Sequence, residues 1–221
     1  LRGRSFSTQV EASAPVTAER AMYLSRPGTF WRVGHGSAGV AAPSTSWYVA
    51  EGCTAWLFDE FLLLNNPNTQ ATVATIRYLL PGGRTITRTY SLPAQSRTTI
   101  WVDGEPGLAQ ADVSAAVTAP LPIVVERAMY WPAGNWQEGH ASAGVTQTGV
   151  RWALAEGENG GPLSAHTYGL LANPSAEAAS VKVTAAVLPR TTVPGAATLP
   201  PRIVQLASDG VGEVAGVGSG V

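Results

Sequence analysis

The sequence TVATIRYLLPGGRTITRTY, residues 72–90, has the pattern of a β-hairpin. Residues 72–79 alternate between two faces and are rich in β-branched and aromatic side chains, which favour strands. The Pro-Gly-Gly motif at 81–83 supplies a turn, and the alternation resumes over residues 84–90. A further strand is expected at 97–102. Since no segment offers a capped, helix-periodic run of ten residues, we expect an all-β fold.

Four sequence blocks occur twice in the same order, about 107 residues apart. The copies are ERAMY at 19–23 and 126–130, GHxSAGV at 34–40 and 139–145, WxxAEG at 47–52 and 152–157, and FLLLNNP at 61–67 matched by YGLLANP at 168–174. A period of this length is too long for a solenoid repeat and is typical of one immunoglobulin-like sandwich. The sequence therefore predicts two tandem antiparallel β-sandwich domains, residues 1–107 and 108–221. The last strand is open to assignment to a neighbouring repeat or subunit.

The composition is that of a folded, weakly charged protein. Hydrophobic residues make up 45% and charged residues 13% of the chain, and the net charge is -1. These values exclude a disordered chain and give no electrostatic attraction to nucleic acid. No apolar run approaches the length of a membrane span, so we expect none. Cys53 is the only cysteine and cannot form an intramolecular disulfide, and we expect no cofactor.

The first and last strands of the chain lie at the same phase of the repeat. Residues 6–10 align with 113–117, and residues 214–221 return to this phase just before a third ERAMY block would begin. A strand without the rest of its domain leaves an unpaired edge. Two interpretations are open: an excerpt from a longer array, or strand exchange with a neighbouring molecule into a head-to-tail filament. The predicted assembly residues are Phe6, Thr8, Val10, Val214, Val217 and Val221.

The repeated Gly-His-x-Ser-x-Gly phrase raises the possibility of a serine hydrolase, with an acidic residue from the WxxAEG block completing a triad. The residues concerned are His35, Ser37, Glu51, His140, Ser142 and Glu156. A nucleophile elbow needs a strand–turn–helix context, and no helix is expected after either serine. The glycines fit a tight loop in which His and Ser satisfy backbone groups. We interpret these residues as structural and the chain as non-catalytic.

The Glu-Arg pairs at 19–20 and 126–127 provide charge near the predicted sandwich. Adjacent strand residues point to opposite faces, so Glu and Arg do not pair with each other. We expect the arginine to bridge to a carboxylate such as Glu51 or Glu156 and to lock one end of the sandwich. The chain lacks the dense aspartate spacing of a calcium loop, and we expect no metal site.

The tryptophans divide into two groups. Trp47 and Trp152 occupy matching positions at the start of apolar strands, so we expect them in the core or at a domain junction. Trp31, Trp56 and Trp136 lie in loop-like stretches, where an exposed ring would stack on sugars and a packed one would cover a proline or methionine. A glycan- or protein-binding adhesion module is therefore the alternative function.

The phrases ERAMYW (126–131), GHxSxGV, WxxAEG and LLxNP resemble repeats of large secreted bacterial surface proteins. Those proteins string together immunoglobulin-like or fibronectin-like modules, and the resemblance covers most of both copies. It implies β-sandwiches and an extracellular or cell-surface location, and it brings no catalytic residues. We therefore expect a non-catalytic structural repeat protein, such as a spacer, stalk or filament subunit. Its expected partners are itself or other surface proteins.

Overall fold

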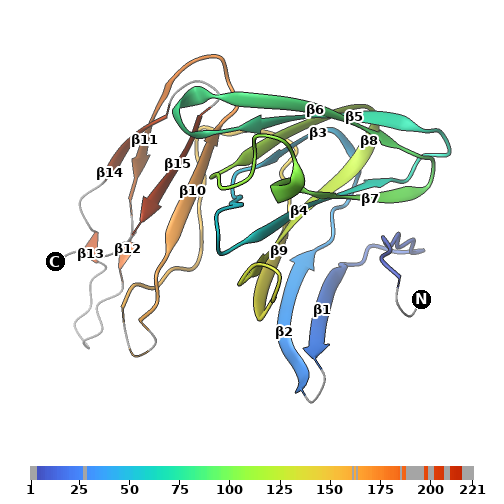
Figure 1. The fold of residues 1–221 in the computed structure, drawn as a ribbon, viewed down its shortest axis with the longest axis horizontal. Coiled ribbons are helices and arrows are strands. Elements are labelled where there is room, and N and C mark those ends of the chain that lie inside the picture. The colour runs from blue at the N-terminus through green and yellow to red at the C-terminus, as the bar shows by residue number, and fades with distance from the viewer. Residues whose placement is uncertain are drawn as a thin grey trace. The chain divides into compact units, whose positions relative to one another are not determined.

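The computed structural model describes residues 4–26, 29–160, 162, 164–184, 186–187, 197–198, 202–206 and 210–215. Within these residues the chain is all-β, with antiparallel strand pairs in a sandwich-like arrangement (Figure 1), which confirms the predicted fold class. None of the described residues form a helix long and apolar enough to cross a membrane. The chain divides into two compact units: residues 1–78 with 85–148, and residues 79–84 with 149–221.

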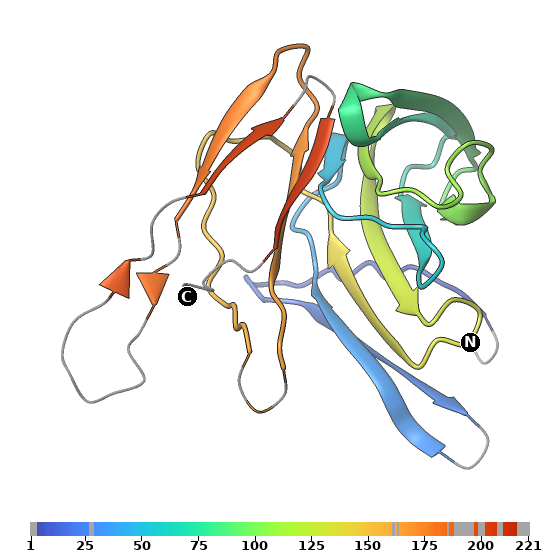
Figure 2. The ribbon, with the colours of Figure 1, turned by 60° about the vertical axis from the view of Figure 1, so that its left-hand side comes forward.

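The first unit contains a branched sheet and a separate hairpin. Its strands are β1 (Glu19–Arg26), β2 (Thr29–Ala38), β3 (Ser44–Val49), β4 (Asp59–Asn66), β5 (Thr72–Leu79), β6 (Thr85–Leu92), β7 (Ser96–Trp101), β8 (Ser114–Trp131) and β9 (Glu138–Ala143). The sheet has the order β6-β5-β8-β4-β7, and β3 and β9 also pair with β8. Strands β1 and β2 form the separate antiparallel hairpin, drawn in blue in Figure 2.

The hairpin predicted at residues 72–90 is present. Strands β5 and β6 are neighbours, and the 3-10 turn η1 (Pro81–Gly83) lies between them in the chain. Gly82 and Gly83 have φ angles of 74° and 78°, in the left-handed region that favours glycine. Ile76 and Tyr78 on β5 are fully buried, so the alternation in the sequence marks the face that turns to the core.

The core of the first unit is formed by alternating apolar residues on several strands. Leu62 and Leu64 of β4 and Ile123 and Val125 of β8 are each 0% exposed. Burying a side chain of this size contributes about 1.5–3 kcal/mol to folding. Two of these four side chains belong to β8, so part of the core would be lost without that strand.

Strand β8 is 18 residues long and connects the parts of the first unit. Its first half pairs with β3, where Trp47 lies opposite Val117. Its second half lies between β4 and β9, where Ala128 is opposite both Phe61 and Ala141. Without β8, the β4–β7 pair and the β5–β6 pair would have no common neighbour.

The second unit contains shorter strands that stay in pairs. They are β10 (Tyr168–Asn173), β11 (Ala179–Val183), β12 (Ala186–Val187), β13 (Ala197–Thr198), β14 (Arg202–Leu206) and β15 (Gly210–Ala215). The described strands form three two-stranded sheets: β10–β15, β11–β14 and β12–β13. The repeat identifies β10 as the counterpart of β4 and β11 as that of β5. Asn66 pairs with Ser96 of β7, and its counterpart Asn173 pairs with Gly210, so β15 takes the place of β7.

The two compact units do not coincide with the two sequence repeats. The boundary predicted after residue 107 assigns β8 and β9 to the second domain. Both strands instead pair within the first unit, which ends near residue 148. The reason is that the first strand of the second repeat completes the sheet of the first unit.

Candidate functional site

In the first unit, β8 covers Trp47 and holds β3 in the sheet. Trp47 is 1% exposed, and its indole Nε1 donates to the carbonyl oxygen of Ile123 on β8 at 2.8 Å. The same nitrogen lies 3.2 Å from the carbonyl oxygen of Ser44. The prediction that Trp47 belongs to the core is confirmed, and its cover is supplied by β8.

Arg127 fixes the second half of β8 through a buried ion pair. Its side chain is 3% exposed, and Nη2 lies 2.5 Å from Oε2 of Glu51. The expected bridge from the ERAMY arginine to Glu51 is therefore confirmed in the second copy of that block. Glu60 is fully buried nearby, and burial raises the pKa of its carboxyl well above the usual range although Arg127 opposes the rise. Burial likewise lowers the pKa of Arg127.

The two block histidines have partners other than the serines. His140 Nδ1 lies 3.3 Å from Nη1 of Arg127, and His140 Nε2 lies 3.3 Å from Oε1 of Glu51. His35 Nε2 lies 3.0 Å from the hydroxyl of Tyr130. Burial lowers the pKa of both histidines, so each favours the neutral imidazole. The imidazoles therefore serve packing and hydrogen-bond contacts.

Ser37 and Ser142 lie within strands β2 and β9, and the prediction of tight loops for these residues is wrong. Each serine hydroxyl donates to the carbonyl of the next residue, and in the described part of the chain neither hydroxyl is hydrogen-bonded to a histidine. Within strand β9 the glycine has a steric role. Gly139 lies opposite Tyr130 on β8, and a Cβ at Gly139 would collide with the tyrosine ring. The glycines of this phrase make room for a cross-strand ring.

The second unit has no strand where the repeat would place the counterpart of β3. Residues 149–154 match β3 in sequence but form no strand. Trp152 is 64% exposed and Leu154 is 81% exposed, whereas Trp47 is 1% exposed. The prediction of a packed Trp152 is wrong for the described chain, because the strand that covers Trp47 has no counterpart here.

The local geometry around Trp152 nevertheless matches that around Trp47. Trp152 Nε1 donates to the carbonyl of Gly149 at 3.0 Å, as Trp47 does to Ser44. In both copies the indole is thus hydrogen-bonded to the carbonyl three residues before it. What differs is the second carbonyl, which β8 provides to Trp47.

Strands β10 and β11 each have one strand neighbour among the described residues. Their counterparts β4 and β5 both lie beside β8, whereas β10 pairs with β15 and β11 pairs with β14. An edge of this kind presents unpaired backbone groups to an added strand. We call residues 149–154, β10 and β11 together the acceptor site.

Residues 7–24 match β8 position by position. They read STQVEASAPVTAERAMYL where β8 reads SAAVTAPLPIVVERAMYW, and nine of the eighteen positions are identical. Residues 4–18 form no strand and are exposed. The exposed members include the predicted assembly residues Phe6, Thr8 and Val10, together with Val16. We call residues 7–24 the donor segment.

The other predicted assembly residues lie at the end of the chain. Val214 belongs to β15 and pairs with Gly169 of β10, so this part of the last strand is used within its own unit. Val217 and Val221 lie outside the described residues. Since β15 corresponds to β7, it is not a copy of the first strand.

The three loop tryptophans have different environments. The side chain of Trp31 lies outside the described residues. Trp56 is 77% exposed, whereas Trp136 is 37% exposed and stacks on Tyr130 with ring centroids 5.1 Å apart. Trp136 Nε1 also donates to Oδ2 of Asp59 at 2.6 Å. Trp136 is therefore a fixed packing residue with one accessible side.

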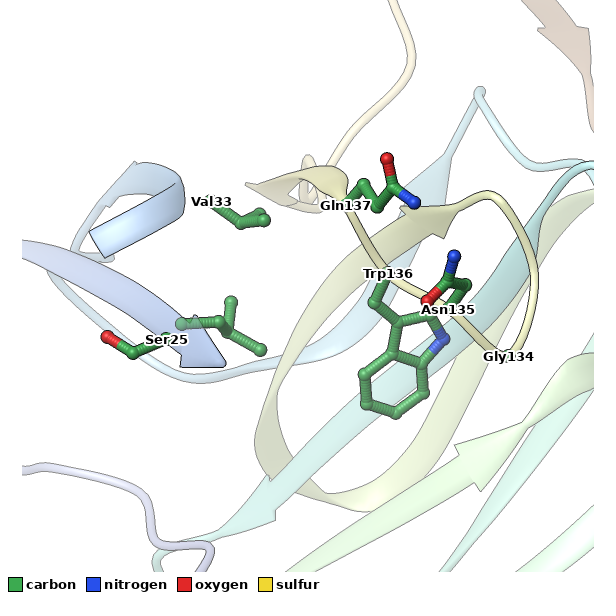
Figure 3. A pocket seen from close by; sticks show the side chains of 7 residues that line it. Ser25, Val33, Gly134, Asn135, Trp136 and Gln137 are labelled. Atoms are coloured by element: carbon green, nitrogen blue, oxygen red, sulfur yellow. The ribbon is translucent and has the colours of Figure 1, made fainter. Parts of the chain in front are cut away.

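A cavity of about 260 Å³ opens between the β1–β2 hairpin and the loop that follows β8. Figure 3 shows the Trp136 ring with Asn135 and Gln137 nearby, and Val33 and Ser25 on the opposite wall. Its lining residues are Leu24, Ser25, Val33, Gly134, Asn135, Trp136 and Gln137. None of these side chains is ionisable, so the cavity offers no acid, base or charged ligand group.

The remaining reactive groups of the described chain do not form a site. Burial raises the pKa of the Cys53 thiol to about 11, so the thiol stays protonated and unreactive at neutral pH. Among the residues described, no three or more His, Cys, Asp or Glu side chains gather as metal ligands would.

Comparisons with known proteins identify no family. No family model matches the chain, and no curated protein matches it. The crystal structure of Thermotoga maritima 1070 is 12% identical and covers 48% of this chain and 96% of its own, with a TM-score of 0.44. The Anabaena sensory rhodopsin transducer is 17% identical and covers 40% of this chain and 91% of its own, with a TM-score of 0.34. Likenesses of this strength say nothing about function.

Proposed function

We propose that the chain is a non-catalytic structural repeat protein in which the first strand of each repeat completes the sandwich of the repeat before it. One observation carries the proposal: β8 begins the second repeat and pairs with strands of the first unit. Added strands bind through main-chain hydrogen bonds and gain specificity from alternate side chains. The role is that of a spacer, stalk or filament subunit at the cell surface, the location implied by the sequence resemblance.

The block residues that suggest a hydrolase support a structural role instead. His140 and Glu51 surround the buried Arg127, and the hydroxyl of Ser142 bonds to its neighbour's carbonyl. A nucleophile would need its base within hydrogen-bond reach. These side chains hold β8 and β9 to the unit.

Matched lysine substitutions test the role of β8. Ile123 is 0% exposed on β8, and its counterpart Val16 is 65% exposed in the donor segment. Ile123→Lys buries an unpaired charge and removes core packing, so we expect the free energy of unfolding to fall by about 3 kcal/mol or more. Val16→Lys should leave it unchanged in dilute solution. Urea unfolding followed by circular dichroism measures both, and an Ile123→Lys chain as stable as the parent would contradict the proposal.

Glycan binding is the second candidate function. It is favoured by Trp136, which is 37% exposed and lines the cavity together with the amides of Asn135 and Gln137 (Figure 3). Polysaccharide pull-down with Trp136→Ala and with the exposed Trp56→Ala tests this function. Retention that neither substitution reduces would remove it.

A further inference from the structure

We infer that the acceptor site of one copy of this chain binds the donor segment of a second copy, in the register that β8 has in the first unit. The inference rests on the proposed function and adds the partner and the pairing. Each copy then gives one strand and receives one. Such a contact is heterologous, and it builds an open head-to-tail array.

The first half of the donor segment fits the stretch around Trp152. The pairing of Trp47 with Val117 transfers to Trp152 with Val10. Trp152 Nε1, which has one carbonyl acceptor at present, then gains the carbonyl of Val16 as Trp47 has that of β8. Two exposed apolar groups of the separate copies are thereby buried against each other.

The second half fits the edge of β10. The pairing of Phe61 with Ala128 transfers to Tyr168 with Ala21. β1 pairs with β2 along one edge, and in the described part of the chain no strand occupies its other edge. β8 has the corresponding neighbours on both edges, β4 and β9. The position beside β1 that β4 fills beside β8 is thus open to β10 of the second copy.

The charges of the two partners also complement each other in this register. Ser46 lies opposite Thr118 in the first unit, and the corresponding residues between copies are Arg151 and Glu11. Arg151 and Glu11 are both exposed. A neutral pair inside the chain thus becomes a pair of opposite charges between chains. Opposite charges directly across two strands stabilise their pairing.

The buried arginine also has a place in the second copy's site. Arg20 corresponds to Arg127, and the carboxylate that faces it is Glu156, the counterpart of Glu51. Glu156 is exposed, and among the described residues it has no ion pair. Thr167 stands where the first unit has the buried Glu60. The contact between Arg20 and the second copy would therefore contain one carboxylate, Glu156, where the first unit has two.

Binding requires the β1–β2 hairpin to leave its present contacts. Met22 and Leu24 pack against β8 and β9, and Arg20 Nη2 lies 2.9 Å from Oε2 of Glu126. This packing is incomplete, since the cavity of Figure 3 lies beneath the hairpin. The exposed residues 7–18 have few such contacts to give up. Assembly is therefore an exchange in which the hairpin gives up these contacts, together with the hydrogen bond between His35 and Tyr130, and β1 gains β10 of the second copy as a neighbouring strand.

A charge exchange tests the partner. Glu11→Arg and Arg151→Glu place like charges opposite each other, so each should weaken self-association by about fivefold. The double variant restores the opposite signs and should return association toward that of the parent. Sedimentation velocity over a range of protein concentrations measures this, and both residues are exposed, so folding is preserved. Association that no variant changes, or a chain that stays monomeric at every concentration, would overturn the inference.

Cysteine pairs test the register. In a Cys53→Ser background, Gln9→Cys with Ala153→Cys places the thiols directly across the two strands, as Ala116 lies across from Tyr48. Gln9→Cys with Ala155→Cys is the control, because a shift of two residues moves the partner by about 6.6 Å along the strand. We expect oxidation to give a ladder of linked chains for the first pair and much less for the control. Equal ladders for both pairs would overturn the register.

A disulfide that closes within one chain would overturn the second-copy assignment, because the donor segment would then fill its own acceptor site. That outcome would leave the proposed function standing, since the module would still be completed by strand addition. The stability of Ile123→Lys decides the proposed function independently, because Ile123 lies on β8 and is buried within the first unit.

Discussion

The two units use corresponding strands, and the difference between them is β8. In the first unit, β4–β7 and β5–β6 are joined through β8, and β3 is added to it. In the second unit, β10–β15 and β11–β14 remain pairs in the described chain, and Trp152 is exposed where Trp47 is buried. Both units contain the strand pairs, whereas in the first unit a strand from the next repeat joins these pairs into one sheet.

Replacing the two matching tryptophans by alanine should give the largest difference between the units. Trp47→Ala removes a ring that is 1% exposed, and we expect it to lower the free energy of unfolding by about 3–5 kcal/mol. Trp152→Ala should cost almost nothing in a dilute sample and should instead weaken self-association. Urea unfolding and sedimentation of both variants measure the contrast. Equal destabilisation by the two would contradict it.

Alanine at the paired glycines should give a smaller contrast. A Cβ at Gly139 collides with the ring of Tyr130, which is 7% exposed and cannot move away. We expect Gly139→Ala to cost about 1–3 kcal/mol through strain in a packed site. A Cβ at Gly34 meets the ring of Tyr23, which is 56% exposed, so less surrounding packing opposes its displacement. Thermal unfolding of Gly34→Ala should therefore differ little from that of the parent.

The stability of the first unit should depend on pH through Glu60, whose counterpart in the second unit is Thr167. Burial raises the pKa of Glu60 in the folded state, so the folded chain binds this proton more tightly than the unfolded chain. Its contribution to stability is fully present below its usual pKa of 4.5 and is lost as the pH rises from there through the raised value. Urea unfolding of Glu60→Gln across this range should show a smaller decrease than the parent. Identical pH profiles would show that Glu60 is not buried as described.

The smallest expected effect is an increase in self-association, opposite to that of Trp152→Ala. Glu126→Gln removes the ion pair that holds Arg20 in the self-packed hairpin, and both side chains of that pair are partly exposed. Partly exposed pairs contribute about 1 kcal/mol or less, so self-association should strengthen by no more than about fivefold. Sedimentation against the parent at equal concentrations detects the change. Weaker association in Glu126→Gln would contradict the exchange.

The sequence was sufficient to predict the β class and several contacts. Alternation over residues 72–90 identified the β5–β6 hairpin, and the doubled Glu-Arg phrase suggested the bridge from Arg127 to Glu51. It did not predict that Trp152 is exposed. The environment of Trp47 depends on β8, which lies about 70 residues further along the chain. No local pattern around Trp152 reports whether such a strand is available.

Val214, which the repeat period assigns to the first strand of a repeat, instead pairs with Gly169 within its own unit. Asn66 and Ser96 are partners in the first copy, and Asn173 and Gly210 in the second, so the second copy is seven residues longer between these points. Loop insertions cost little free energy, so a repeat need not keep its period across them. A fixed offset therefore matched Val214 to the first strand, whereas Val214 lies in β15, which corresponds to β7.

The covalent tether of β8 also determines how an array of these chains would respond to dilution. β8 is tethered to the strands that it completes, so its local concentration is high and dilution does not release it. The donor segment of a second copy has no such tether and leaves when the protein is diluted. Arrays would therefore lengthen and shorten with protein concentration through the contact between copies, whereas the first unit of each copy would stay complete.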